Sequence, residues 1–143
     1  MRRILLGCLL VSAASGAATP RPGHPLVGVW RLAMPGFACR ETIEFRPDGT
    51  SASSSAGEEA SGAYEVSDRA AENGRYELTA SITRSNGGTD CFGDTAPVGV
   101  PVTSYVHLYP GDRLFFCPGP SSTACFGPYV TVPRKPARAP ASS

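Results

Sequence analysis

Apolar and polar residues alternate with a period of two along most of this chain, and no other feature constrains its fold as much. In the stretch Arg75–Arg84, apolar residues occupy every second position, with charged or hydroxyl-bearing residues between them. The stretches Cys39–Arg46 and Val102–Leu108 repeat the pattern. Such a period is typical of antiparallel strands with one buried face, so the alternation predicts an all-β fold.

Short runs rich in glycine, proline, aspartate and asparagine separate these stretches. In Pro47-Asp48-Gly49, for example, the proline presets φ and the glycine accepts a positive φ, as a tight turn requires. About eight short antiparallel strands are expected, in a meander barrel or a sandwich. We favour a closed barrel, because closure removes sheet edges. Further strands are predicted at Val27–Met34, Thr50–Ser55, Ala63–Ser67, Leu114–Cys117 and Tyr129–Val132.

Length and hydrophobic content fit one small domain. The chain has 143 residues, of which 41% are hydrophobic, which suits a single modest core. We place the barrel at residues 26–132. The alternation predicts a core of Trp30, Leu32, Ile43, Phe45, Tyr64, Val66, Tyr76, Leu78, Ile82, Val106 and Leu108.

The first 17 residues have the pattern of a signal peptide. Arg2 and Arg3 precede a short apolar run, and small residues follow, so we expect cleavage after Ala17. A lipobox at Cys8, which would make that cysteine a lipidated first residue, is the alternative, but the apolar run before it is too short. Residues 18–25, rich in proline, are predicted to be a linker. Residues 133–143 lack large apolar groups, so a disordered C-terminal tail is predicted there.

Removal of the signal peptide leaves four cysteines, Cys39, Cys91, Cys117 and Cys125. An even number in an exported chain predicts two disulfides, with three possible connectivities. We favour Cys117–Cys125, because the small residues between them allow a tight hairpin, and this leaves Cys39–Cys91 as the second bridge. Pairing of Cys91 with Cys117 or Cys125 is the competing pattern. The arginine bias and the abundant alanine, glycine and proline suggest a bacterial protein, and the signal peptide and the even cysteine number indicate a periplasmic or secreted location.

The charge balance excludes one broad class of partner. Without Arg2 and Arg3, 11 basic residues stand against 12 acidic ones, a formal net charge of −1. A general nucleic-acid-binding protein would instead present a basic face. No long apolar run remains beyond the N-terminus, so no transmembrane segment is expected in the mature chain.

A resemblance to a known fold family begins after the predicted linker. The sequence Leu26-Val27-Gly28-Val29-Trp30 resembles the G-x-W start of the first strand in lipocalin-like and avidin-like barrels. The resemblance continues through the hairpin at Phe45–Thr50 to Tyr64. It implies that Trp30 closes one barrel end and that Gly28, the glycine of the same motif, has a structural role. In those families an arginine from the last strand often covers the tryptophan, and Arg134 is the late candidate here.

The whole pattern is most similar to small exported bacterial proteins with lipocalin-like barrels. It also resembles, more weakly, periplasmic inhibitors of secreted metalloproteases, which are disulfide-bearing barrels. Those inhibitors insert an N-terminal trunk into the protease cleft, and Thr19–Pro25 would correspond to that trunk.

Few residues could support catalysis or hold a metal ion. His24 lies in the predicted linker, and His107 lies on the polar face of a strand. There is no G-x-S-x-G motif, and no pair of cysteines or histidines has the spacing of a metal site. Glu58 and Glu59 are expected in a solvated loop, and Asp90 and Asp94 lack the spacing of an EF-hand. We therefore expect no enzyme activity, cofactor or metal.

Glu41 is the one charged residue that the alternation turns inward. A buried carboxylate is costly unless a donor such as Arg31 pairs with it. One interpretation is a ligand contact near the barrel mouth. We favour the alternative, a residue at the strand end that reaches water or is displaced by a bulge.

These observations predict an exported, non-enzymatic barrel that binds a ligand or belongs to the cell envelope. Its partner is unknown, and a small apolar ligand and an envelope protein are the two candidates. The alternative function is a periplasmic inhibitor of a protease or another hydrolase. A ligand-binding barrel needs an apolar cavity of several hundred Å³, in the range of about 300–1,000 Å³. An inhibitor instead needs an ordered segment or loop that protrudes.

Overall fold

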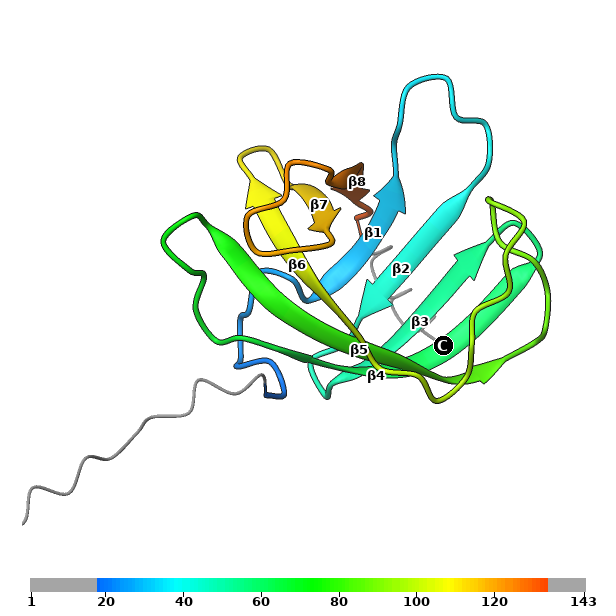
Figure 1. Ribbon diagram of the computed structural model, residues 1–143, viewed down its shortest axis with the longest axis horizontal. Helices are drawn as coiled ribbons and strands as arrows, with labels where there is room; N and C mark the ends of the chain where they lie inside the picture. The colour runs from blue at the N-terminus through cyan, green and yellow to red at the C-terminus, as the bar shows by residue number, and fades with distance from the viewer. Residues whose placement is uncertain (1–17, 134–143) are drawn as a thin grey trace, which may run out of the picture.

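The computed structural model describes residues 18–133, which form a closed antiparallel barrel (Figure 1). Each strand pairs with the next in sequence, and β1 also pairs with β8. The prediction of an all-β meander barrel is therefore confirmed. The predicted signal peptide and the predicted tail after Pro133 lie outside the described residues. The strands are β1 (Gly28–Leu32), β2 (Glu41–Phe45), β3 (Thr50–Ser55), β4 (Glu58–Val66), β5 (Arg75–Ser85), β6 (Val102–Tyr109), β7 (Arg113–Cys117) and β8 (Phe126–Thr131).

The turn between β2 and β3 shows how the predicted turn residues act. The amide of Arg46 donates to the carbonyl of Thr50 (2.9 Å), and Gly49 adopts a φ of 84°. The Asp48 carboxylate accepts a hydrogen bond from the amide of Thr50 (2.9 Å). The local side chain and the glycine together set the hairpin.

Strand β4 begins earlier than the sequence analysis predicted. Glu58 and Glu59 were expected in a solvated loop, but they are the first two residues of β4. Buried and exposed residues alternate strictly along this strand, and small residues such as Ala60 and Gly62 face the interior. A Cβ at Gly62 would lie 2.4 Å from the carbonyl oxygen of Ser81. Close packing against β5 therefore requires the small residues that resemble a loop in the sequence.

The core matches most of the predicted residues. Ile43, Tyr76 and Leu108 pack against it while partly buried, and Ile82 is only half-buried. The sequence analysis did not place Leu26, Leu114 and Tyr129 in the core, yet each is at most 2% exposed. The buried cluster comprises Leu26, Trp30, Leu32, Phe45, Tyr64, Val66, Leu78, Val106, Leu114 and Tyr129.

The segment predicted as a linker packs against the barrel. Ala18 forms a bridge with Val66, and His24 is 2% exposed. The His24 ring makes a hydrogen bond through Nε2 with the carbonyl of Ser67 (3.1 Å), and its Nδ1 accepts the amide of Leu26 (3.2 Å). We call the end of the barrel where β1 begins, which this segment covers, the closed end.

Both disulfides join the cysteines in the predicted pairs. The Cα atoms of Cys39 and Cys91 lie 5.8 Å apart, and those of Cys117 and Cys125 lie 4.1 Å apart. Among residues 18–133, no helix has the length and apolar character needed to cross a membrane.

Candidate functional site

The candidate site lies at the end of the barrel opposite the closed end, which we call the loop end. Four connections lie at this end: residues 33–40 between β1 and β2, residues 56–57 between β3 and β4, residues 86–101 between β5 and β6, and residues 118–125 between β7 and β8. The β1–β2 and β5–β6 connections lie on the right of Figure 1. We call residues 86–101 the braced loop, because the Cys39–Cys91 disulfide ties it to the β1–β2 connection.

Glu41, the first residue of β2, points into the loop end. The Ser55 hydroxyl donates to its Oε2 (2.9 Å), and the Tyr129 hydroxyl donates to its Oε1. The register between β2 and β3 is unbroken from Glu41 to Phe45, so no bulge displaces the side chain. The bulge that the favoured interpretation allowed is therefore absent, while Glu41 lies at the strand end and is partly exposed, as its other form expected. The donors are two hydroxyls and not Arg31, whose exposed side chain lies on the other face of β1.

Burial raises the pKa of Tyr129 above its ordinary value, and the hydrogen bond to Glu41 raises it further. The phenol consequently remains protonated at neutral pH and can act as a donor. Because both carboxylate oxygens of Glu41 already accept hydrogen bonds within the protein, this geometry orients the side chain firmly.

The braced loop is fixed by more than its disulfide. The amide of Cys91 donates to the Ser55 hydroxyl (3.0 Å), and this hydroxyl in turn donates to Glu41. Ser55 therefore links the loop to Glu41. The amide of Ala96 donates to the carboxylate of Glu58 (2.7 Å), a side chain of which 6% is exposed. The Asp90 carboxylate accepts the amides of Phe92 (2.8 Å) and of a second loop residue, Asp94 (2.9 Å). These contacts give the loop one defined shape.

Large apolar side chains are exposed on and beside this loop. Phe92 is 52% exposed, Val98 is 56% exposed and Val100 is 50% exposed. The first residue of β6, Val102, is 58% exposed. The Phe92 ring stacks on that of Phe37, with centroids 5.5 Å apart. We call Phe92, Val98, Val100 and Val102 the apolar patch.

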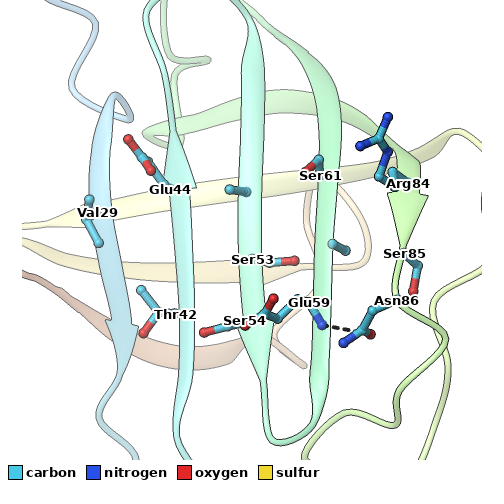
Figure 2. A pocket seen from close by; sticks show the side chains of 12 residues that line it. Val29, Thr42, Glu44, Ser53, Ser54, Glu59, Ser61, Arg84, Ser85 and Asn86 are labelled. Carbon is cyan, nitrogen blue, oxygen red and sulfur yellow. Dashed lines mark hydrogen bonds between the residues drawn. The ribbon is translucent and has the colours of Figure 1, made fainter.

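A hollow of about 460 Å³ lies on the outer face of β1–β5 (Figure 2). Cross-strand pairing places its lining residues in rows. One row runs from β1 to β5 through Val29, Glu44, Ala52, Ser61 and Arg84. These residues alternate with interior ones such as the buried Trp30, so the row faces outward. We call this hollow the outer groove.

Small side chains form the floor of the outer groove. Ser54 and Ser61 lie between Glu44 on one side and Arg84 on the other in Figure 2. Cross-strand pairing places Ala52 between Glu44 and Ser61. The amide of Glu59 donates to the Asn86 side chain (3.1 Å) at one end. Glu44 contacts Arg46 at 3.3 Å. The groove is therefore polar, shallow and charged at its walls.

The G-x-W residues lie at the closed end. The indole of Trp30 donates to the carbonyl of Leu26 (2.8 Å), which folds the preceding segment under the barrel. Gly28 adopts a φ of 152°, which side-chain-bearing residues rarely adopt. Arg134, the predicted cover for the tryptophan, lies outside the described residues.

The Cys117–Cys125 disulfide closes the connection between β7 and β8. The guanidinium of Arg75 donates to the carbonyls of Gly119 (2.9 Å) and Ser122 (2.7 Å) in that connection. The ring of Phe126, the residue after Cys125, contacts that of Phe92 on the braced loop, with centroids 5.5 Å apart, so this connection borders the braced loop.

Neither histidine belongs to the loop end. Both ring nitrogens of His24 are engaged at the closed end, and burial lowers its pKa. His107 stacks on Tyr109 with centroids 4.0 Å apart, and desolvation lowers its pKa as well. Within the described part of the chain, no group of three histidine, cysteine, aspartate or glutamate side chains could hold a metal ion.

Sequence reasoning did not identify the partners of Glu41. Ser55 lies in a run of small polar residues, and Tyr129 was assigned only to a strand. Trp30 and Ile43 face inward, and continuing the same alternation onto the next strand would have placed Ser55 on the inward face. The contact between Glu41 and Tyr129 on β8, however, forms only because the barrel closes. Comparison of this chain with family models, curated proteins and solved structures found no match.

Proposed function

We propose that this chain is an exported, non-enzymatic binding protein whose partner is another protein, bound at the loop end. The observation that carries the proposal is the apolar patch on a loop of fixed shape. Phe92, Val98 and Val100 each expose half or more of their surface. Large apolar side chains that are exposed together on one loop favour an interaction site there, whereas single ones scattered over a surface do not.

The fixed shape of the braced loop favours binding further. Ordering a flexible loop opposes association, so a loop already held by a disulfide and hydrogen bonds retains more of its contact energy. Here the Cys39–Cys91 disulfide, the Ser55 hydroxyl and the Glu58 carboxylate all hold the loop. Two disulfides are also consistent with an oxidising, exported environment.

A protein partner fits the loop end better than a small apolar ligand. Such a ligand would enter beside Glu41, a charged side chain that Ser55 and Tyr129 hold in place. Buried aromatic and aliphatic side chains occupy the barrel interior beyond it, among them Phe45, Tyr64 and Leu114. The apolar surface that is open to a partner lies outside, on the braced loop.

The test compares the protein with Phe92→Ser/Val100→Ser in cross-linking and capture from envelope extract, followed by titration with the purified partner. Tyr109→Ser is the matched control, because Tyr109 is 41% exposed but lies on β6 away from the loop. We expect the double variant to lose at least tenfold in affinity, which corresponds to about 1.4 kcal/mol. Equal binding by the protein and both variants would refute the proposal.

Inhibition of a hydrolase is the second candidate, and the same loop favours it. The described part of the N-terminal segment, expected as a trunk, packs on the closed end. The ordered element that carries exposed side chains is the braced loop. Assays against a panel of exported proteases test this candidate: inhibition that Phe92→Ser abolishes supports it, and unchanged protease activity at saturating protein excludes it for that panel.

A further inference from the structure

We infer that the outer groove holds the chain's own C-terminal segment, residues 134–143. This inference concerns a different surface from the loop end and does not depend on the proposed function. It rests on where the described chain ends, on the length of the segment and on the charges of the groove and the segment.

The described chain ends beside the groove. The amide of Val132 donates to the carbonyl of Val29 (2.8 Å), and Val29 lines the groove. Val132 therefore extends the outward row that continues through Glu44, Ala52 and Ser61. A chain that continues from this point starts at the edge of the groove.

The charges of the two surfaces are opposite. The segment contains Arg134, Lys135 and Arg138 and no acidic residue. Residues 18–133 contain 8 basic and 12 acidic residues, a formal net charge of −4. Two of those carboxylates, Glu44 and Glu59, line the groove, together with one basic residue, Arg84.

The spacing of the charges matches as well. Neighbouring strands lie about 4.8 Å apart, so Glu44 on β2 is about 10 Å from β8, and Glu59 on β4 is about 19 Å from it. An extended chain advances about 3.3 Å per residue. From Val132, Arg134 is then about 7 Å away and Arg138 about 20 Å away, so each arginine can reach one glutamate.

The remaining residues of the segment suit a shallow groove. They are prolines, alanines and serines, which keep the chain extended and carry little bulk. The floor of the groove, formed by Ala52, Ser54 and Ser61, offers space for an extended backbone. Attachment to β8 gives the segment an effective concentration in the millimolar range, so the charge pairs and the backbone contacts together need to supply only about 4 kcal/mol to keep it bound.

The first experiment uses the full chain. Amide chemical shifts of Ala52, Ser54 and Ser61 are compared between the protein and Arg134→Gln/Arg138→Gln. The matched control is Arg40→Gln/Arg69→Gln, which removes two exposed charges outside the groove. We expect the first variant to change these three shifts and the control to leave them unchanged. Unchanged shifts in both variants would overturn the inference.

The second experiment adds a synthetic peptide of residues 134–143 to a chain that ends at Pro133, which retains all eight strands of the described structure. The peptide should shift the same amides, and Glu44→Gln/Glu59→Gln should weaken its binding roughly threefold to tenfold. The full chain should bind the peptide much more weakly, since its groove is occupied. Equal binding to both chains, or shifts confined to another surface, would contradict occupation by the segment.

Discussion

The hydroxyl of Tyr129 donates a hydrogen bond to the carboxylate of Glu41, so the last strand of the barrel meets the second strand across the loop end. The other carboxylate oxygen accepts the Ser55 hydroxyl, which in turn accepts the amide of Cys91. A series of three hydrogen bonds thus connects the barrel wall to the braced loop. Removal of any of these hydrogen bonds should alter both the stability of the barrel and the order of the loop.

Replacement of Tyr129 by phenylalanine removes the buried donor and leaves Glu41 with one donor fewer. A hydrogen bond to a charged group contributes about 1.5–3 kcal/mol, so we expect Tyr129→Phe to lower the free energy of unfolding by about that amount. Urea denaturation measures the change. Tyr105→Phe is the control, with an expected change within about 0.5 kcal/mol. Equal losses in the two variants would contradict the assigned role of Tyr129.

Stability should fall as the pH is lowered past the ordinary pKa of histidine. Burial lowers the pKa of His24 in the folded protein, so the unfolded chain binds more protons near pH 6. The stabilisation is fully present above the unfolded pKa and is lost as the pH falls below it. Urea denaturation at pH 7.5 and pH 5 should show the decrease, and His24→Asn should reduce it.

His107→Asn is the matched variant for that measurement, because the pKa of His107 is also lowered while its ring is less buried than that of His24. The His107→Asn variant should retain the part of the pH-dependent loss of stability that His24 causes. Nuclear magnetic resonance can follow each imidazole separately. A titration midpoint for His24 at or above 6.5 would show that its ring is not held neutral.

The two disulfides should contribute unequally to stability. They span 52 and 8 residues, and closure of the longer loop removes more conformational entropy from the unfolded chain. Chain entropy assigns about 4 kcal/mol to Cys39–Cys91 and about 2.5 kcal/mol to Cys117–Cys125. Paired cysteine-to-serine variants, unfolded in urea, measure both. A larger loss for the Cys117–Cys125 pair would show that native contacts around Arg75 outweigh loop entropy.

Local patterns predicted the strands, the tight turns and the disulfide pairs, because each depends on residues close in sequence or on a loop that allows closure. They failed where a side chain's role depends on distant neighbours. Glu58 resembled a loop residue because the small residues around it pack against β5, which a local pattern does not reveal. His24 resembled part of a linker, yet its partner Ser67 is 43 residues away.

The candidate site shows the same limit more strongly. Alternation predicted the inward direction of Glu41, and its place at the end of a strand favoured escape to water or displacement by a bulge. Its true partner on β8 comes close only because the barrel closes, and that contact spans 88 residues. The apolar patch was equally hidden, because the local sequence does not show whether a valine is buried or exposed.

The most direct test of binding through the loop end is site-specific photo-cross-linking in the cells that make the protein. A photoreactive phenylalanine analogue replaces Phe92 in one variant and the control residue Tyr109 in another, both exposed apolar positions. We predict a discrete cross-linked product with one partner protein from position 92 and none from position 109. Products from position 109 alone, or identical products from both positions, would contradict the assignment of the loop end as the binding surface.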